Sequence, residues 1–592
     1  MATFGIENVL SLLCGLALFL YGMDVMGEGL KRSAGNRLKV FLGKMTSSPI
    51  KGFFLGLIVT LVIQSSSATT VMVVGFVNSG IMTLLQSVGV IIGANLGTAI
   101  TAWLTALNSL GGDGGKELTG ALSVLKPSSW VPIVAVLGIC LLMFSKKSKK
   151  KDLGAILLGF AVLMKGMDFM SDAVGPLKHN EAFTGILTMF GKYPFLAILA
   201  GLVLTAIVQS SSASVGILQA LTMTGAITYG AAIPIVMGQN IGTCVTAMLS
   251  SLGANKNGKR AAVIHLSFNV IGVAVVSLLF YSLDAFISFS FLDGFIDAWG
   301  VAIVHTVFKL ISIVLIGPFY RQLEKLSRVI IRDKADDEES TSLLDERLLD
   351  TPAVAVERAA QVTRDMAAIS YQAMQEAFLL IDENYDPKRA ELVRELEGKV
   401  DGYEDALGSY LVKVSACQLD DKNSAEVTKL LHIIGDFERI SDHAVNIAES
   451  VEELRDKKIS FSDEAKRELG VLRAAVGEIL KITYDAFVAN DVDAALNVEP
   501  LEQVVDDLRD KIKRGHILRL QKSECTIEHG FVLSDMLTNF ERVADPCSNI
   551  GGCVIEISSF DALDMHKYLA SVKQGSETYD EAYRSYTAKY SI

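Results

Sequence analysis

Apolar runs interrupted at matching places by short polar clusters constrain this sequence more than any other feature. At residues 64–70 the segment QSSSATT stands between GFFLGLIVTLVI and VMVVGFV. A similar cluster, QSSSASV, begins at Gln209. Every backbone polar group in lipid must be satisfied, so irregular backbone survives there only when it is buried in protein or lines a wet cavity. The clusters therefore mark either close helix packing or a polar site inside a membrane domain.

The charge distribution divides the chain into two parts. Up to Tyr320 there are 20 Lys and Arg against 12 Asp and Glu, whereas the whole chain has 54 against 66. An apolar, mildly basic part is thus followed by an acidic, charge-rich part, which predicts two physical environments. We expect a transmembrane domain over 1–322, an acidic linker over 323–350 and a cytoplasmic helical domain over 351–592. The first apolar run lacks a preceding basic region, so we interpret it as a retained span and not as a signal peptide.

Membrane spans are expected where about 20 apolar residues follow one another. Such runs cover about 8–28, 129–145, 153–175, 261–288 and 298–319. Basic loops mark the cytoplasmic side, and they occur at 31–51, 146–151, 256–260 and 321–328. This orientation is consistent only if the regions 50–107 and 194–252 each cross the membrane an odd number of times. The acidic part then lies in the cytoplasm.

The membrane part contains an internal repeat. Gln64 and Gln209 are 145 positions apart, and at the same offset Gly93-Ala-Asn-Leu-Gly-Thr matches Gly238-Gln-Asn-Ile-Gly-Thr. We assign repeat 1 to about 8–110, repeat 2 to about 153–255, and additional spans to 261–319. The basic loop of the first copy lies inside, and its counterpart at 176–193 lies outside. The copies are therefore expected to be inverted, as in many transporters, with a binding site near the membrane midplane.

The residue types in the repeated clusters suit an anion with a cation beside it. Runs of serine are poor helix interiors, so each cluster is expected at the tip of a broken, re-entrant hairpin. The helix N-terminus exposed there attracts anions, and hydroxyl and amide oxygens can bind a hard cation such as Na⁺. A single serine run could serve helix packing alone, but two copies in register favour the binding site.

The doubled QSSS, the doubled G-x-N-(I/L)-G-T and the motifs His265-Leu-Ser-Phe-Asn and His305-Thr-Val-Phe-Lys resemble the type II sodium/phosphate cotransporter family over about residues 5–320. The resemblance implies Na⁺-driven phosphate movement, with His265 and His305 packing in the scaffold. Lys309 stands where the first His motif has Asn269, which leaves the role of that position open. The phosphate and sodium site implied by the resemblance consists of Gln64, Ser65, Ser66, Ser67, Asn95, Thr98, Gln209, Ser210, Ser211, Ser212, Asn240 and Thr243.

The acidic part is expected to contain six amphipathic helices at about 353–381, 387–416, 423–453, 462–489, 496–522 and 528–557. A second repeat, of DFERISDHAVNI at 436–447 and NFERVADPCSNI at 539–550, divides them into two three-helix halves. Like charges four residues apart repel one another on a helix, which calls for a bound cation or for a solvated face paired with Arg439 and Arg542. The candidate metal ligands are Glu397, Asp401, Glu438, Asp442, Glu502, Asp506, Glu541 and Asp545.

The doubled E-R-(I/V)-x-D-x-x-x-N-I pattern resembles PhoU-like proteins over about residues 350–560. The resemblance implies a cytoplasmic domain that binds a divalent or iron-type metal and regulates phosphate uptake. One departure affects the second half: Pro546 follows Asp545 where the first copy has His443. Because proline removes a helix hydrogen bond, the metal geometry there is in question.

Together these patterns predict an all-α, multi-pass protein of the bacterial inner membrane that moves inorganic phosphate with Na⁺ as the coupling ion. The expected partners are phosphate, sodium, the lipid bilayer, a cytoplasmic regulatory protein and further copies of the chain, with no nucleic acid. A phosphate exporter and a membrane-anchored phosphate receptor are the alternatives. An enzyme is not expected, because the sequence has no nucleophile–base constellation, P-loop or dinucleotide motif.

Overall fold

The computed structural model describes residues 4–44, 48–109, 127–332, 344–382, 385–417, 419–558 and 577–592, and these residues are almost entirely helical. They contain no strand, only an isolated bridge between Thr228 and Phe295. The chain forms two compact units, Met1–Ala353 and Val354–Ile592. The acidic segment 335–342 (ADDEESTS), part of the predicted linker, lies outside the described residues, whereas 344–353 belongs to the first unit.

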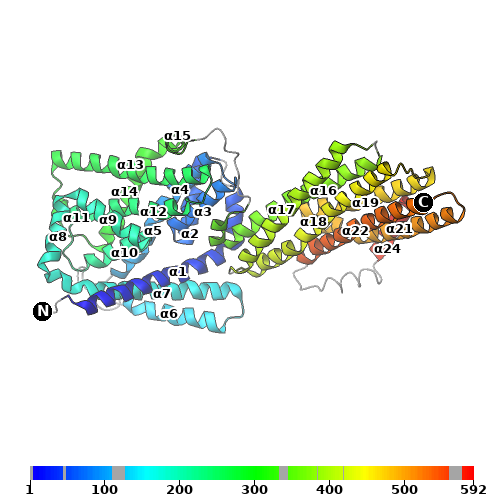
Figure 1. The fold of residues 1–592 in the computed structure, drawn as a ribbon. Helices are drawn as coiled ribbons and strands as arrows, with labels where there is room; N and C mark the ends of the chain where they lie inside the picture. Colours follow the sequence, from blue (N-terminus) through cyan, green and yellow to red (C-terminus); the bar gives the residue numbers. More distant parts are fainter. Residues whose placement is uncertain are drawn as a thin grey trace. The chain divides into compact units, whose positions relative to one another are not determined.

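The first unit consists mainly of apolar helices joined by short turns (Figure 1). Runs of short helices, such as α2 to α5, separate long ones, such as α1 and α7. The helices are α1 Ile6–Lys44, α2 Pro49–Ile63, α3 Ser66–Asn78, α4 Leu84–Gly97, α5 Ala99–Ala106, α6 Pro127–Phe144, α7 Ser148–Val174, α8 Glu181–Lys192, α9 Pro194–Val208, α10 Ser211–Thr222, α11 Tyr229–Gly242, α12 Cys244–Ser250, α13 Lys256–Ile287, α14 Ala298–Ile316 and α15 Tyr320–Ile330.

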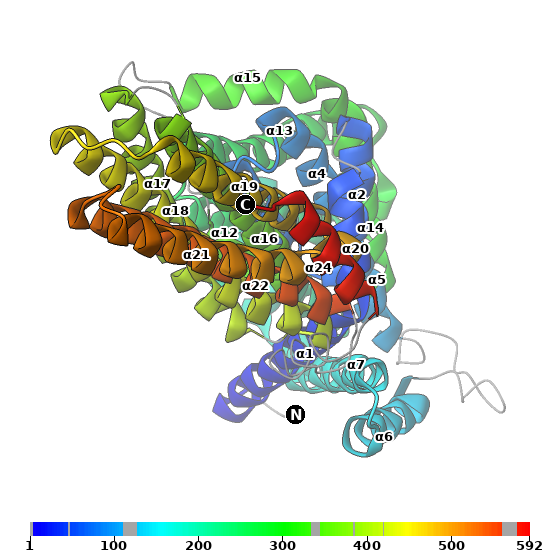
Figure 2. The same cartoon turned by 90° about the vertical axis from the view of Figure 1, so that its right-hand side faces the viewer.

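Glycines let α1 and α7 pack backbone to backbone, and α6 lies along the other side of α7 (Figures 1 and 2). A Cβ on Gly22 would lie 2.3 Å from the Leu163 amide nitrogen, and one on Gly166 would lie 2.4 Å from that of Phe19. Small residues of this kind are the usual contact between membrane helices, because lipid offers no hydrophobic drive for their association. The Gly-Met-Asp motif that both helices carry thus holds them together.

The repeat in the sequence is also a repeat of packing. A Cβ on Gly56 of α2 would lie 2.0 Å from the Val90 carbonyl oxygen of α4. A Cβ on Gly201 of α9 would lie 2.2 Å from the Ile235 carbonyl oxygen of α11. Both contacts sit 145 positions apart in the two copies. Because the glycines have the same spacing in both copies, the same helix pair is formed twice.

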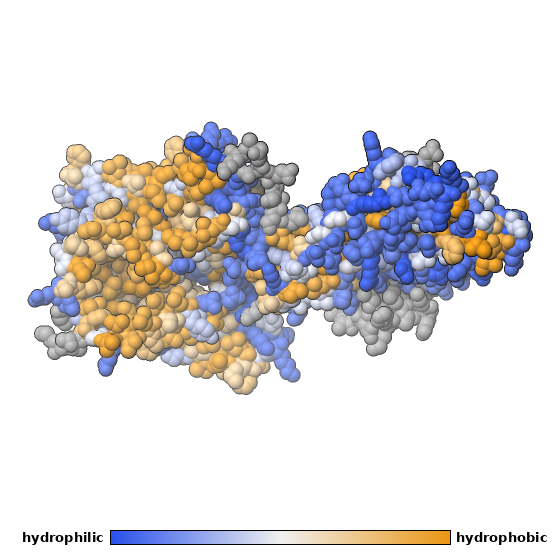
Figure 3. All heavy atoms as spheres, viewed as in Figure 1, coloured by the Kyte–Doolittle hydropathy of each residue, from blue (hydrophilic) through white to orange (hydrophobic). Residues whose placement is uncertain are grey.

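The surface of the first unit suits a lipid environment. Within the part of the chain that the structure describes, six helical stretches are long and apolar enough to cross a membrane: 6–33, 84–109, 148–177, 229–250, 256–287 and 298–330. α2 and α3, with 15 and 13 residues, are too short to span it singly, since a crossing takes about 20. Figure 3 shows hydrophobic side chains over most of the visible face of this unit, whereas the visible face of the second unit is mainly hydrophilic.

A short polar segment at residues 345–350 packs against the ends of two helices of the first unit. It includes a 3-10 turn at Glu346–Asp350, preceded by Asp345. Asp345 accepts a hydrogen bond of 2.7 Å from the Asn78 amide at the end of α3. Arg347 pairs with Asp345 at 2.7 Å and donates to the Ser250 carbonyl at the end of α12 at 2.8 Å. The segment therefore joins the end of α3 in the first repeat to the end of α12 in the second repeat.

The second unit contains long amphipathic helices packed side by side. Stacked or tilted aromatic rings join them, such as Phe378 with Phe540 at 6.0 Å and Phe437 with Phe487 at 5.2 Å between ring centroids. Helix α22 continues through Pro546. The helices are α16 Pro352–Asp382, α17 Pro387–Ser415, α18 Asp421–Asp456, α19 Asp463–Ala489, α20 Val492–Ala495, α21 Val498–Gln521, α22 Ile527–Ser558 and α24 Glu577–Lys589.

Candidate functional site

The two QSSS segments form the same tight turn. At the first, α2 ends and Gln64 takes a left-handed conformation with φ 58° and ψ 20°. At the second, α9 ends and Gln209 has φ 54° and ψ 18°. A left-handed backbone is uncommon for residues other than glycine, so its occurrence at both glutamines shows that the copies share a backbone as well as a sequence.

Each turn reverses the chain into a short hairpin. The Ser65 hydroxyl caps α3 by accepting the Ala68 amide at 3.1 Å, and the Ser210 hydroxyl caps α10 by accepting the Ala213 amide at 3.2 Å. Across the first turn the Thr60 hydroxyl donates to that of Thr69 at 3.0 Å. The same bond occurs in the second copy between Thr205 and Ser214, at 2.8 Å. The expectation of helices broken at QSSS is therefore met in the backbone.

The serines after the caps place hydroxyls at the helix N-termini. Ser66 is 3% exposed, and its Oγ has no hydrogen-bond partner among the described residues. Ser211 and Ser212 are buried as well, and Ser67 is partly exposed. A buried hydroxyl without a partner costs free energy, and the first turn of a helix offers free N–H groups and a positive dipole end. An anion bound at these turns would accept hydrogen bonds from the serine hydroxyl and from the free N–H groups.

The G-x-N-x-G-T motifs break the helices that pack beside the hairpins. α4 ends at Gly97 and α5 begins at Ala99, with Thr98 between them. α11 ends at Gly242 and α12 begins at Cys244, with Thr243 between them. Each threonine hydroxyl donates back into the preceding turn, Thr98 to the Ala94 carbonyl at 3.3 Å and Thr243 to the Gln239 carbonyl at 2.9 Å.

The two repeats are connected through these broken helices. The Thr101 hydroxyl of α5 donates to the Gln64 side chain of its own repeat at 3.0 Å. The Thr105 hydroxyl of the same helix donates to Gln219 of α10, in the other repeat, at 2.5 Å. Reciprocally, α12 packs against α3. Among the described residues no hydrogen bond joins Ser65–Ser67 directly to Ser210–Ser212.

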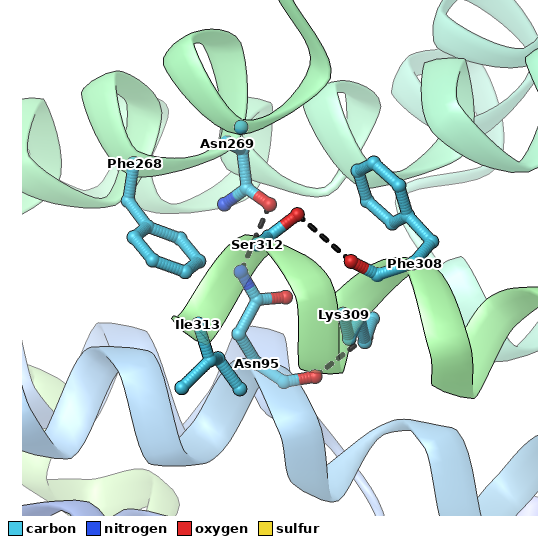
Figure 4. Close-up of a pocket in the computed structure, with 8 residues that line it drawn as sticks. Asn95, Phe268, Asn269, Phe308, Lys309, Ser312 and Ile313 are labelled. Carbon is cyan, nitrogen blue, oxygen red and sulfur yellow. Dashed lines mark hydrogen bonds between the residues drawn. The ribbon is translucent and has the colours of Figure 1, made fainter. Parts of the chain in front are cut away.

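A small pocket lies beside the first helix break (Figure 4). The Asn95 side chain donates to Asn269 of α13 at 2.9 Å, and its counterpart Asn240 instead donates to the Val236 carbonyl of its own helix at 2.8 Å. The buried Lys309 ammonium of α14 donates to the Asn95 carbonyl at 2.6 Å. The pocket is lined by Asn95, Phe268, Asn269, Gly272, Phe308, Lys309, Ser312 and Ile313.

Sequence reasoning missed the contact of Lys309 with Asn95. It placed both residues in motifs, but they are 214 positions apart and nothing in the sequence pairs them. The available signal was the lysine itself, an ionisable residue inside an otherwise apolar span, which is a functional hypothesis by default. His265 and His305 are buried, each 2% exposed, as expected for scaffold residues.

In the second unit, the first set of predicted metal ligands forms a cluster of like charges on α17 and α18. Burial raises the pKa of Glu438 to about 7, and the neighbouring Asp442 carboxylate adds to this rise. Burial likewise raises the pKa of Glu397, with contributions from Asp442 and Asp401. Protonation of one carboxyl group is therefore available to relieve the repulsion without a metal ion.

The second set is arranged differently, because an arginine neutralises it. Arg509 pairs with Glu541 at 2.6 Å and lies 3.6 Å from Asp506. The pKa of Asp545 is raised by burial and by the charges of Glu541 and Asp506. Glu502 lies on the same helix as Asp506, α21. A guanidinium thus occupies the place between α21 and α22 where a metal ion was expected.

The structure does not support the predicted metal site. Within the described ranges, no group of three or more His, Cys, Asp and Glu side chains is arranged to hold a metal ion. The physical reason is that protonation and Arg509 already compensate the carboxylate repulsion from which the metal was inferred. Arg439, which was the alternative partner in the first half, lies 3.6 Å from Asp436.

Comparison with protein families assigns both units. A Na⁺/Pi-cotransporter family model matches residues 18–172 and 176–296, and a PhoU-domain model matches 363–451 and 471–554. The chain joins a Na⁺/Pi-cotransporter domain to a PhoU domain. With its apolar helices, this assignment makes it a multi-pass membrane protein of a phosphate-transporter type. The resemblances inferred from the two doubled motifs are confirmed.

Individual relatives match different parts of the chain. YjbB of Escherichia coli strain K12, named as a candidate inorganic phosphate export protein, is 24% identical over 93% of this chain and 98% of its own length. Human sodium-dependent phosphate transport protein 2B is 33% identical over 18% of this chain and 16% of its own. A PhoU homolog of Thermotoga maritima is 30% identical over 26% of this chain and 65% of its own.

Proposed function

We propose that this protein carries inorganic phosphate across a bacterial inner membrane together with Na⁺, through a site built by its two QSSS hairpins. The observation that carries the proposal is the duplicated turn, with left-handed glutamines at 64 and 209 and a serine-capped helix after each. The Na⁺/Pi-cotransporter model, which includes both turns, supports the choice of substrate and ion.

The chemistry of the site suits an anion that arrives with a cation. Among the residues of the two turns none is basic, so helix N-termini, serine hydroxyls and Na⁺ would have to offset the phosphate charge. The Ser66 hydroxyl, which is buried and has no hydrogen-bond partner among the described residues, is the first candidate ligand. The other proposed ligands are Gln64, Ser65, Ser67, Asn95, Thr98, Gln209, Ser210, Ser211, Ser212, Asn240 and Thr243.

Alternating access would follow from an inverted arrangement of the two repeats. Each repeat combines a hairpin with a broken helix, α2–α3 with α4–α5 and α9–α10 with α11–α12. A hairpin that returns to its own side plus one crossing gives the odd number of crossings that the basic loops require. The hairpins would then enter from opposite sides and meet the substrate near the midplane.

The second unit would act as a cytoplasmic regulator. Its PhoU-model match and its likeness to a PhoU homolog support this role. The hydrophilic surface in Figure 3 suits an aqueous compartment. Long packed helices with an exposed acidic face could serve as a docking surface for a regulatory protein or for another copy of the chain.

Export of phosphate is the second candidate function. It is favoured by one observation, the match to YjbB over nearly the full length of both chains. The same site could run in either direction, because the ion and phosphate gradients, and not the fold, set the net flux. The two candidates therefore share the site and differ in the direction of transport.

Labelled phosphate flux in proteoliposomes tests the proposal. We expect phosphate to move with an imposed Na⁺ gradient, in the direction of that gradient, and not with a K⁺ gradient. The double variant Ser66→Ala, Ser211→Ala should lower this flux at least tenfold, since each change removes a buried hydroxyl ligand worth about 1–3 kcal/mol. A matched control, Ser109→Ala, changes a serine outside both hairpins.

Three results would count against it. Binding of phosphate without flux under either gradient would favour a receptor. Phosphate flux that does not depend on the Na⁺ gradient would contradict sodium coupling. Phosphate flux that is unchanged in the double variant would show that the binding site does not include Ser66 and Ser211.

A further inference from the structure

Lys309 is a buried lysine at the helix break of the first repeat. It lies in α14, is 4% exposed, and donates from Nζ to the Asn95 carbonyl oxygen at 2.6 Å. Among the described residues no Asp or Glu pairs with it. An ionisable side chain in a membrane domain is costly and normally has a function, so this position calls for a specific role.

The oxygen that Lys309 contacts belongs to a type of site that membrane proteins use for cations. Asn95 lies in the last turn of α4, which ends at Gly97. Its carbonyl also accepts the Thr98 hydroxyl at 3.1 Å. The C-terminal end of a half-helix carries a partial negative charge, and such ends, with unwound carbonyls, coordinate the coupling ion in transporters. Lys309 therefore places a positive charge where a mobile cation could otherwise bind.

Among the described residues, no lysine donates a hydrogen bond to the corresponding carbonyl at the second helix break. α13 and α14 carry matching motifs, with His265, Phe268 and Asn269 in one and His305, Phe308 and Lys309 in the other, and all six side chains are buried. At the second helix break the Asn240 carbonyl accepts only the weak Cys244 thiol at 3.8 Å, within the described part of the chain. The residue of α13 that matches Lys309 is Asn269, which is neutral; it lies at the first break too, where its side-chain oxygen accepts the Asn95 amide at 2.9 Å.

We propose that Lys309 is a resident cation that replaces one coupling ion at the first helix break, so that a mobile Na⁺ is needed only at the second. This deepens the proposed function and rests on its cation site. Figure 4 shows the arrangement, with Lys309 on one side of Asn95 and Asn269 on the other. The lysine would hold the broken helix and offset phosphate charge without being transported.

The test restores the neutral residue of the other motif. In Lys309→Asn the first break gains an oxygen and loses its fixed charge, so we expect one more Na⁺ and one more positive charge to move per phosphate. The readouts are the ratio of labelled sodium to labelled phosphate, the Hill coefficient for Na⁺ and the reversal potential in proteoliposomes. Lys309→Arg, which keeps the charge, should leave the sodium ratio at the wild-type value.

A binding measurement keeps the test decisive if Lys309→Asn transports too slowly. Ligands that bind only the folded state raise the melting temperature. Replacing choline by sodium should therefore stabilise Lys309→Asn by more degrees than wild type. Lys309→Met, which offers neither charge nor oxygen, should show no such gain.

The outcomes separate this proposal from the proposed function. If the phosphate flux of the wild type does not depend on Na⁺, sodium coupling of the wild type is contradicted. Even then, Lys309→Asn must acquire a Na⁺-dependent flux if the lysine is a resident cation. An unchanged sodium ratio and an unchanged sodium stabilisation in Lys309→Asn overturn the resident cation. The proposal is also overturned if Lys309→Asn binds phosphate more weakly while its Hill coefficient for Na⁺ does not rise. That result would assign Lys309 to direct phosphate binding.

Discussion

At the scale of single residues, buried polar groups distinguish the two units. In the first unit the polar side chains at the helix breaks bond to one another, as Asn95 does with Asn269, or to backbone carbonyls, as Thr98 does, whereas Ser66 has no partner in the described structure. In the second unit partly buried carboxylates lie close together and their pKa values rise. The polar groups of the first unit suit the binding of a ligand, and the clustered carboxylates of the second unit suit a response to pH.

Glu438 is expected to make the second unit less stable as the pH rises. Its pKa is about 7 in the folded chain and 4.5 in an ordinary environment, so the folded state holds the proton more tightly. Stability from this group is present below about pH 4.5 and is lost as the pH rises to about 7. Glu438→Gln should remove that slope and increase stability at pH 8, by about 1 kcal/mol or less because the site is partly solvated.

Hydrogen exchange measured by mass spectrometry can follow this effect in peptides from α17 and α18. Tryptophan fluorescence cannot, because Trp103, Trp130 and Trp299 all lie in the first unit. Glu395→Gln, on the exposed side of α17, serves as the control. The expectation is wrong if protection, corrected for the intrinsic exchange rate, is the same at pH 5 and pH 8 in the wild type.

At the scale of secondary structure, glycine spacing determines which helices pair. α2 with α4, α9 with α11, and α1 with α7 all approach through glycines whose hydrogen faces a partner backbone. Polar turns then decide where these helices break. In the first unit, small residues therefore determine helix pairing and helix ends more than hydrophobicity does, because hydrophobic residues occur along nearly all of these helices.

Gly22→Ala should destabilise the first unit strongly. The added Cβ would lie 2.3 Å from the Leu163 amide nitrogen, and neither backbone can move away without disturbing the α1–α7 contact. Overpacking of this kind costs about 1–3 kcal/mol or more. Gly185→Ala in α8 is the matched control, because nothing lies within 4 Å of its added Cβ. Thermal unfolding in detergent should show a lower midpoint for the first variant only.

Much of this architecture could be predicted from the sequence, for a physical reason. Doubled clusters such as Gln64–Ser67 are local signals, and a broken helix needs only local information. The six long helices of the second unit also follow from amphipathic periodicity. The pairing of Lys309 with Asn95 could not be predicted, because it depends on how α14 packs against α4, over 214 positions.

The structure does not support the metal prediction, for a related reason. The spacing Glu438/Asp442 shows which carboxylates share a helix face, but not what lies opposite. Arg509, three positions after Asp506, turned out to pair with Glu541 of the next helix. Charge compensation between helices depends on side-chain geometry, which a one-dimensional pattern does not contain.

At the scale of the whole molecule, the proposed alternating access depends on the inverted orientation that we predict for the two repeats. It makes a definite statement about sidedness. The loops at Asn180 and Asp293 should face outward, and those at Lys147 and Lys256 should face the cytoplasm. Of these residues, Asn180, Lys147 and Asp293 are exposed in the structure, which makes them suitable reporters.

Single-cysteine labelling tests this sidedness directly. In a background without the seven native cysteines, Asn180→Cys and Asp293→Cys should react with a membrane-impermeant maleimide added to intact cells stripped of their outer membrane. Lys147→Cys should react only after the inner membrane is permeabilised. Asn180 precedes the second hairpin, whereas the first hairpin follows the basic loop at 31–51, so this pattern would place the hairpins on opposite sides. Reaction of Asn180→Cys only after permeabilisation would place it on the same side as the basic loop at 31–51, and the two QSSS turns could not then form one midplane site by inversion.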